Sequence, residues 1–205
     1  MNRLEARGLG CSRGAARLFR DVTFEASAGE WVALRGPNGS GKTTLLRCVA
    51  GLAHADAGVT VWNGEAIARE REAFHAAVLY AGHLPGIKDD LSAEENLHAA
   101  IALRGVTTTA EAMRGALDQV GLGARRRIPA RKLSAGQRRR IGLARLALDP
   151  APLWLLDEPL TALDGQGQAL FERMLASHLA RGGLAVISTH HTLDPRPARE
   201  VRLGA

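Results

Sequence analysis

The sequence predicts an α/β fold in which a largely parallel sheet alternates with helices and an antiparallel patch accompanies it. Three observations support this prediction. Short apolar runs alternate with helical patterns, a glycine-rich loop joins one such run to a helix, and the early strands carry a hairpin-turn signal. Continuous apolar runs are typical of strands covered on both faces, as the strands of parallel sheets are.

In the first part of the chain, short strands surround a single helix. Residues 4–8 and 22–26 have strand character, and 31–34 is a compact apolar run bounded by glycines. A helix is expected over 42–50, because its leucines and valine share one face. The strand expected at 59–62 meets an Asn-Gly pair, which is typical of a two-residue hairpin turn.

The second part of the chain alternates helices with apolar strands. After a strand at 78–80, the pattern is helical over 92–121 with a break at Arg104-Gly105. Ser92 and Glu95 match the capping box that starts a helix. The remaining expected elements are a helix at 134–148, a strand at 153–156, a helix at 166–180, a strand at 185–188 and an edge strand at 200–203.

The bulk composition bounds the class of protein. A chain of 205 residues can bury a core without disulfides or metals, as one domain or two closely packed lobes. Cys11 and Cys48 make no disulfide framework and are expected to be reduced thiols in a cytosolic protein. No apolar run is long enough to span a bilayer and no signal core is present, so a partner is needed to hold the protein at a membrane.

The formal net charge is +6, and only three of the 27 basic residues are lysines. No aromatic residues interleave with the arginine runs at 125–127 and 138–140, so nucleic acid is not an expected partner. These runs are expected to be solvated faces. The alternative for the second run is contact with a membrane partner or with anionic lipid headgroups.

The chemistry begins with a phosphate-binding loop, which matches its pattern at every fixed position and stands between an expected strand and an expected helix. Its glycines allow backbone N–H groups to surround a phosphate, and the helix N-terminus adds partial positive charge. Lys42 is expected to reach the β- and γ-phosphates, and Thr43 to ligate Mg²⁺. The expected ATP-binding residues are Gly36, Pro37, Asn38, Gly39, Ser40, Gly41, Lys42, Thr43 and Thr44.

Two adjacent acids end the apolar strand at 153–156. Asp157 is expected to hold Mg²⁺, directly or through water, together with Thr43. Glu158 is expected to be the general base that polarises the attacking water, a role typically worth about 10²–10⁴ in rate.

A second helix start behind small residues comes at Leu133-Ser134-Ala135-Gly136-Gln137. Its N–H groups and the Ser134 hydroxyl could donate to an anion, yet a chain with one phosphate loop has no use of its own for a second such site. At this point the sequence resembles the ABC ATPase family, whose signature motif is LSGGQ, with Ala135 in place of the first glycine. The resemblance extends from Leu4 to Leu203.

The family resemblance implies an architecture and a dimer. It implies a P-loop NTPase with a RecA-like parallel-sheet core, an antiparallel β subdomain and a helical signature subdomain, forming a single nucleotide-binding domain over 1–205. Residues 1–91 and 149–205 are then mainly core with the β subdomain, and 92–148 the helical subdomain. In this family the signature of one subunit closes over ATP held by another. Ser134, Ala135, Gly136 and Gln137 are therefore expected to serve a second copy in a head-to-tail dimer.

Further family motifs follow by resemblance. Thr161-Ala162-Leu163-Asp164 looks like the D-loop, which assigns Asp164. His190, just past the strand at 185–188, looks like the switch histidine that contacts the γ-phosphate. His83 stands where the family has its Q-loop glutamine, a position near the Mg²⁺ water and the membrane partner. The family's adenine-stacking aromatic residue is missing near 11–14, so GTP remains an alternative to ATP.

Within the family, the stretch 80–88 and the helix from Ser134 resemble the haem-exporter ATPases of cytochrome c maturation. This resemblance implies a peripheral subunit on the cytoplasmic face of a bacterial inner membrane. Two copies would sit under a membrane-spanning permease, with no direct haem contact, and ATP hydrolysis would drive haem export. The alternatives are the ATPase of a different small ABC transporter, a soluble ABC-type ATPase acting on nucleic acid or ribosomes, and a non-hydrolysing nucleotide sensor, which Glu158 disfavours.

Overall fold

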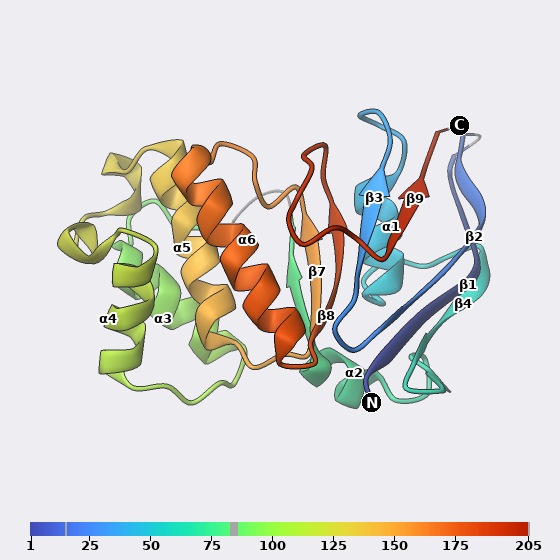
Figure 1. Cartoon of the computed structure of the whole chain (residues 1–205), viewed down its shortest axis with the longest axis horizontal. Helices are drawn as coiled ribbons and strands as arrows, with labels where there is room; N and C mark the ends of the chain where they lie inside the picture. The colour runs from blue at the N-terminus through green and yellow to red at the C-terminus, as the bar shows by residue number, and fades with distance from the viewer. Residues whose placement is uncertain (15, 83–85, 205) are drawn as a thin grey trace. The chain divides into compact units, whose positions relative to one another are not determined.

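The structure is a computed structural model that describes residues 1–14, 16–82 and 86–204. Its described strands form two sheets (Figure 1). The parallel sheet has the order β6-β7-β8-β3-β9, and each pair of neighbours in it is parallel. Its strands are β3 (Trp31–Arg35), β6 (Val78–Ala81), β7 (Leu153–Asp157), β8 (Leu184–Ser188) and β9 (Arg199–Arg202).

The second sheet is antiparallel, with the order β2-β1-β4-β5. Its strands are β1 (Arg3–Arg13), β2 (Ala16–Ser27), β4 (Ala57–Trp62) and β5 (Glu65–Ala66). The predicted combination of a parallel sheet and an antiparallel patch is confirmed. The edge strand expected at 200–203 is β9, which pairs with β3.

Two compact units divide the chain. The first comprises Met1–His83, Ala151–Pro159 and Leu175–Ala205, and holds both sheets with α1 (Lys42–Val49) and α2 (Arg71–Ala77). The second comprises Leu84–Pro150 and Leu160–Met174. It holds three helices that pack on one another, together with the start of α6 (Gly165–Ala180) and two short 3₁₀ turns. The three helices are α3 (Ala93–Leu103), α4 (Ala110–Gln119) and α5 (Ala135–Leu148), and the 3₁₀ turns are η1 (Gly123–Arg125) and η2 (Ala130–Lys132).

Aliphatic residues make the core of the first unit, as the low aromatic content predicts. Leu45, Leu46 and Val49 on one face of α1 are fully buried, which confirms the predicted apolar stripe. They share a cluster with Leu34, Leu155 and Val186 of the parallel sheet and with Leu4 and Phe24 of the antiparallel sheet. Burial of α1 against these strands holds the phosphate loop, which precedes it, at the end of β3.

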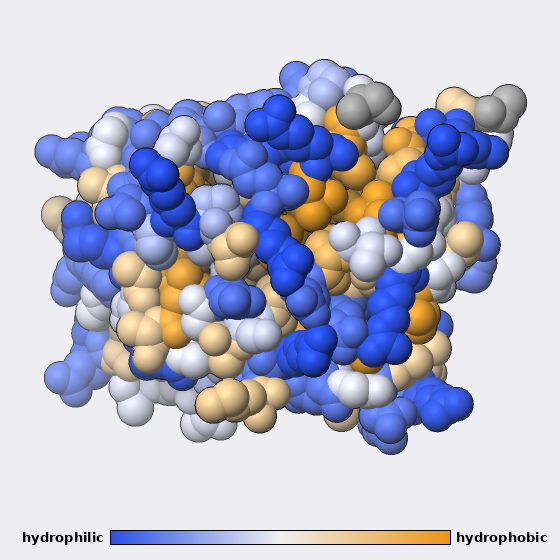
Figure 2. All heavy atoms as spheres, turned by 45° about the vertical axis from the view of Figure 1, so that its right-hand side comes forward, coloured by the Kyte–Doolittle hydropathy of each residue, from blue (hydrophilic) through white to orange (hydrophobic). Residues whose placement is uncertain are grey.

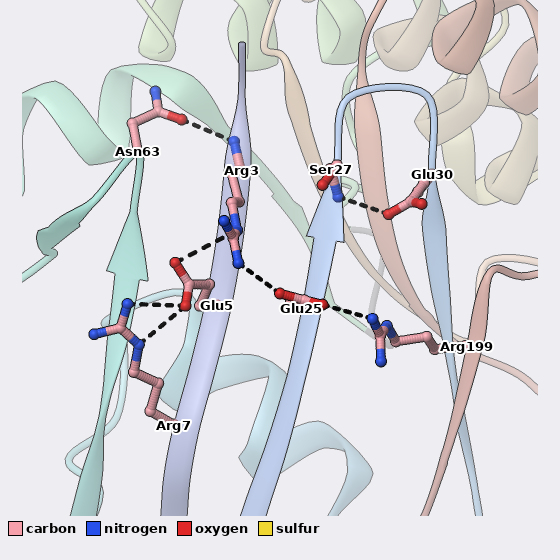
Figure 3. Close-up of polar contacts among 8 residues, drawn as sticks. All are labelled: Arg3, Glu5, Arg7, Glu25, Ser27, Glu30, Asn63 and Arg199. Carbon is pink, nitrogen blue, oxygen red and sulfur yellow. Dashed lines mark hydrogen bonds and ion pairs between the residues drawn. The ribbon is translucent and has the colours of Figure 1, made fainter.

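The Asn63-Gly64 turn forms as predicted. Asn63 and Gly64 have φ angles of 52° and 90°, which a two-residue turn between twisted strands requires. Trp62 pairs with Glu65 across the turn. The side chain of Asn63 also accepts a hydrogen bond of 2.8 Å from the backbone N–H of Arg3, which secures the turn to β1 (Figure 3).

Alternating charges cross the strands of the first unit in Figure 3. Glu25 of β2 is contacted by Arg3 of β1 and by Arg199 of β9, each at 2.6 Å. Arg7 extends the row by binding Glu5 at 2.8 Å. Exposed pairs of this kind contribute little each to the free energy of unfolding. The pair between Arg199 and Glu25 joins β9, at the edge of the parallel sheet, to β2 of the antiparallel sheet.

The structure corrects two details of the sequence reading. Strands β1 and β2 run for 11 and 12 residues, well beyond 4–8 and 22–26. They continue past Gly8 and Gly10 because register shifts in the β1–β2 pairing absorb these glycines. Helix α2 was not predicted, because it buries only Phe74 and so presents no apolar stripe.

Hydrophilic side chains cover most of the face shown in Figure 2, with hydrophobic atoms visible between them. Among the described residues, the exposed large hydrophobic side chains are Met1, Leu52, Val59 and Leu103. No helix in the described ranges is long and apolar enough to cross a membrane. Both cysteines are free and buried, and burial raises the pKa of the Cys48 thiol to about 12.

Candidate functional site

The phosphate loop connects β3 to α1, which begins at Lys42. Gly36, Gly39 and Gly41 all have positive φ angles, between 82° and 144°. A Cβ atom at Gly36 would overlap the carbonyl oxygen of Leu203 and lie 2.7 Å from the Ser40 hydroxyl. Only glycine fits there, so the loop can wrap tightly and turn its N–H groups inward.

Lys42 is buried at the base of the loop. Its ammonium donates to the carbonyl oxygens of Gly36 at 2.8 Å and Pro37 at 3.1 Å. It also lies 3.5 Å from Nε2 of His190. A buried ammonium needs such partners because water no longer solvates it. The charge is therefore held against the loop and beside the predicted switch histidine.

The predicted metal ligands meet in the structure. The hydroxyl of Thr43 donates to Oδ2 of Asp157 at 2.6 Å. Asp157 ends β7, and Ser188 at the end of the neighbouring β8 donates to its other oxygen at 2.5 Å. Asp157 and Ser188 are both buried. A hydroxyl and a carboxylate oxygen on adjoining elements form the hard-oxygen set that suits Mg²⁺.

Glu158 follows Asp157 in a conformation that non-glycine residues rarely adopt, with φ of 50°. Its backbone N–H donates to the carbonyl oxygen and to the hydroxyl of Ser188, both at 3.0 Å. Its Oε1 lies 3.3 Å from Nε2 of His190. Strained backbone of this type persists only where neighbours hold it, and it is common at functional sites. Ser188 supplies that support.

The loop that carries His190 is tied to the strand before the phosphate loop. One guanidinium nitrogen of Arg35, Nη1, donates to the carbonyl oxygens of Thr189 and His191, each at 2.7 Å. The N–H of His191 donates to the Thr189 hydroxyl at 3.0 Å. Lys42, Glu158 and His190 are thus brought together.

In the second unit, α5 begins where the sequence predicts a helix start, and the structure shows that Ser134 is its N-cap. Its hydroxyl accepts from the N–H of Gln137 at 3.2 Å, and the Gln137 side chain accepts from the N–H of Ser134 at 3.0 Å. The Ser134 hydroxyl keeps its own proton to donate to an anion. A Cβ at Gly136 would lie 2.8 Å from the carbonyl oxygen of Ala162, so a glycine is needed at this position. Ala135 is the first residue of α5.

Asp164 lies within the second unit on a network that reaches the signature helix. It accepts from the N–H of Gly167 at 2.9 Å and from Arg140 of α5 at 2.7 Å. These two donors, the Gly167 N–H foremost, hold the pKa of the Asp164 carboxyl below its ordinary value. Arg140 therefore does not belong to a solvated face, which corrects the expectation for the run 138–140.

The expectation for His83 remains a prediction, because this residue lies outside the described residues. Phe19 is buried with its ring near the phosphate loop, since a Cβ at Gly41 would lie 3.1 Å from its Cδ1.

Sequence reasoning missed Arg35 and Ser188. The contact of Ser188 with Asp157 could not be predicted, because it depends on the pairing of β7 with β8, and no local sequence pattern shows which strands are neighbours. A weak indication of Arg35 was present in the sequence, because a charged residue at the end of an apolar strand needs a polar partner when it is partly buried.

A phosphate loop, an acidic strand end and a capped signature helix on this two-sheet framework define a P-loop ATPase with an ABC-type signature. The family model described as ABC transporter matches residues 19–161, and the chain belongs to this family. It is 49% identical over 203 residues to the cytochrome c biogenesis ATP-binding export protein CcmA of Pseudomonas putida, covering 98% of this chain and 96% of that one. The CcmA of Salmonella typhi is 48% identical over 199 residues, covering 97% and 94%.

The fold agrees with a solved relative. An ABC transporter ATP-binding protein from Pyrococcus furiosus superposes with a TM-score of 0.85 at 25% identity, covering 98% of this chain and 97% of that one. As a member of this family, the chain binds ATP and couples its hydrolysis to transport.

Proposed function

We propose that the chain is the energy-coupling ATPase subunit of a membrane complex that exports haem for cytochrome c biogenesis. The observation that carries this proposal is the 49% identity over 98% of the chain to a cytochrome c biogenesis ATP-binding export protein. Similarity of that extent covers both units rather than the ATPase motifs alone. The whole chain, 1–205, would act as one nucleotide-binding domain, with 92–148 as its helical subdomain.

ATP binding would rest on the phosphate loop, residues 36–44. Its inward N–H groups would cradle the phosphates, and Lys42 would exchange its loop carbonyl contacts for the β- and γ-phosphates. Mg²⁺ is usually bound by one or two protein oxygens together with substrate phosphates. Thr43 and Asp157 would hold it jointly with the nucleotide, and the ion would neutralise phosphate charge.

Hydrolysis would rest on Glu158 and His190. Glu158 would accept a proton from water as the water oxygen attacks the γ-phosphorus and the bond to the bridging β–γ oxygen breaks. His190, 3.3 Å from Glu158 and 3.5 Å from Lys42, would contact the γ-phosphate and so align the base with the cation. Ser188 would hold the acidic pair in place through its bonds to Asp157 and Glu158.

A second copy of the chain and a membrane-spanning permease would complete the transport complex. The Ser134 hydroxyl and the start of α5 would donate to ATP held by a second copy, with Asp164 close to that contact in a head-to-tail dimer. Two copies would lie on the cytoplasmic face of the inner membrane beneath the permease of the cytochrome c maturation system. His83 would stand at the Q-loop position.

Affinity purification tests the assignment. The tagged chain is recovered from gently solubilised membranes with Mg-ATP, and the accompanying proteins are identified by mass spectrometry. A Lys42→Ala chain, which should not bind ATP, serves as the matched control for nucleotide-dependent partners. Recovery with a cytochrome c maturation permease supports the proposal. Recovery with a different permease would retain the ATPase and reject haem export, and recovery with ribosomes or nucleic acid alone would reject the transporter role.

A further inference from the structure

Arg35 lies between the phosphate loop and the 189–191 loop of the first unit. It ends β3, directly before Gly36, and its side chain is 17% exposed. Together with Gly36, Pro37 and His190 it lines a cavity of about 560 Å³. Glu200 of β9 lines the same cavity and holds Nε of Arg35 at 3.5 Å.

The Arg35 guanidinium restricts the backbone around His190. Its Nη1 donates at 2.7 Å to the carbonyl of residue 189, which belongs to the peptide plane before His190. The same nitrogen donates at 2.7 Å to the carbonyl of residue 191, which belongs to the plane after His191. Because both peptide planes are held by the same Arg35 nitrogen, the backbone of residues 190–191 between them can adopt few conformations. The backbone hydrogen bond from Thr189 N–H to Leu34, at 3.3 Å, anchors the start of the loop.

The anchored loop determines where the His190 side chain lies. That side chain is about half exposed, so packing alone does not hold it. The His190 Nε2 atom lies 3.3 Å from Oε1 of Glu158 and 3.5 Å from Nζ of Lys42. A guanidinium suits the anchoring task, because it is always charged and its donors have a fixed planar geometry.

We propose that Arg35 is a positioning residue for ATP hydrolysis, which clamps the 189–191 loop so that His190 meets the γ-phosphate beside Glu158 and Lys42. Glu200 orients the Arg35 guanidinium through the contact with its Nε. The inference rests on the proposed role of His190 in hydrolysis. Arg35 acts through His190 and does not itself contact the reacting atoms.

The test compares variants of the full chain in complex with the permease recovered from membranes. Arg35→Ala is expected to lower kcat about 10²-fold, because a small misplacement of a catalytic group has a cost of that order. The ATP Kd, measured by equilibrium dialysis, should stay within about twofold, since the phosphate loop is retained. Arg35→Lys should restore part of the loss, because an ammonium donates but lacks the planar fork. Arg202→Ala is the matched control. Arg202 pairs with the same Glu200 at 3.6 Å but is largely exposed, so its loss should leave turnover unchanged.

A double-mutant cycle with His190→Ala separates this inference from the function on which it rests. If Arg35 works through His190, adding Arg35→Ala to His190→Ala should lower phosphate release by less than about threefold further. A full and independent loss in that background would overturn the clamp, as would normal turnover of Arg35→Ala when His190→Ala is defective. Normal turnover of His190→Ala would instead remove His190 from the proposed mechanism, and the clamp with it.

Glu200→Gln covers the case in which Arg35→Ala does not fold. It removes the charge that orients Arg35 and leaves both loop carbonyl contacts available. A kcat loss relative to the wild type that is absent in the His190→Ala background supports the clamp. A loss that persists in the His190→Ala background contradicts it.

Discussion

Ser188 shows how much of the site depends on a single buried hydroxyl. It donates to Asp157 at 2.5 Å and accepts from the N–H of Glu158 at 3.0 Å. One side chain therefore orients the carboxylate expected to hold Mg²⁺ and supports the strained backbone of the expected base. The parallel pairing of β7 with β8 brings Ser188 opposite Asp157.

Ser188→Ala should raise the Mg²⁺ concentration needed for half-maximal turnover and lower kcat. Loss of a buried hydroxyl that satisfies other groups also has a stability cost of about 1–3 kcal/mol. Turnover measured across a Mg²⁺ titration, with the exposed Ser177→Ala as control, checks this expectation. An unchanged Mg²⁺ dependence would show that Ser188 supports the fold but does not orient Asp157.

Glu158→Gln should abolish turnover while ATP binding persists, because an amide cannot accept the proton but fills the same space. A loss of about 10²–10⁴ in kcat is expected for a missing general base. The variant should also accumulate as an ATP-bound dimer, visible by gel filtration with Mg-ATP. Lys42→Ala provides the contrast, since it should neither bind nucleotide nor dimerise. A Glu158→Gln chain that stays monomeric and turns over normally would refute the role.

At the scale of elements, α5 and the segment before α6 are joined within the second unit. Arg140 of α5 donates to Asp164 and to the carbonyl of Val120, while Gly136 packs against Ala162. The signature and the D-loop expected from the sequence are thereby held in one arrangement.

Arg140→Ala should weaken ATP-dependent dimerisation, because Asp164 loses a charged donor that orients it. Arg138→Ala is the matched control, since Arg138 lies in the same helix as Arg140 but pairs with Asp89, at 3.5 Å. Sedimentation of both variants in the Glu158→Gln background measures the effect. The pKa of the Asp164 carboxyl is lowered, so this group should stay ionised and keep its contact with Arg140 throughout the ordinary carboxyl pKa range. The contact should be lost only as the pH falls through the lowered pKa. Equal dimerisation of the two variants would contradict this coupling.

At the scale of the whole molecule, a buried histidine links folding stability to pH. His178 stacks on Trp154 with ring centroids 3.8 Å apart, and its Nε2 lies 3.2 Å from the carbonyl oxygen of Leu184. Burial, as the main cause, lowers the pKa of His178 from 6.5 to about 4. The folded chain therefore keeps this histidine neutral at pH values where the unfolded chain protonates it.

Stability should accordingly fall as pH drops from 6.5 towards about 4, since the unfolded state binds the extra proton in that window. The loss is on the order of 3 kcal/mol from this group. Urea unfolding of the wild type and of His178→Phe, which preserves the stacking, measures the difference across that range. Parallel pH dependences for the two chains would show that His178 is not the responsible group.

The sequence by itself determined the parts of this protein whose signals are local. The phosphate loop, the Asn63-Gly64 turn and the capping box at Ser92 each depend on neighbouring residues, so their geometry could be predicted. The alternation of apolar strands with helices was sufficient for the α/β class. The lengths of β1 and β2 could not be predicted, because the register shifts that extend them depend on the partner strand.

Only the tertiary structure decided which distant residues share the site. Arg35, Ser188 and Arg140 are recognised by their contacts with His190's loop, Asp157 and Asp164, and each contact joins residues at least 24 positions apart. Strand order and helix packing bring such distant residues together, and no local sequence pattern predicts either of them. The residues proposed for the site could therefore be predicted from the sequence, whereas the contacts that orient them could not.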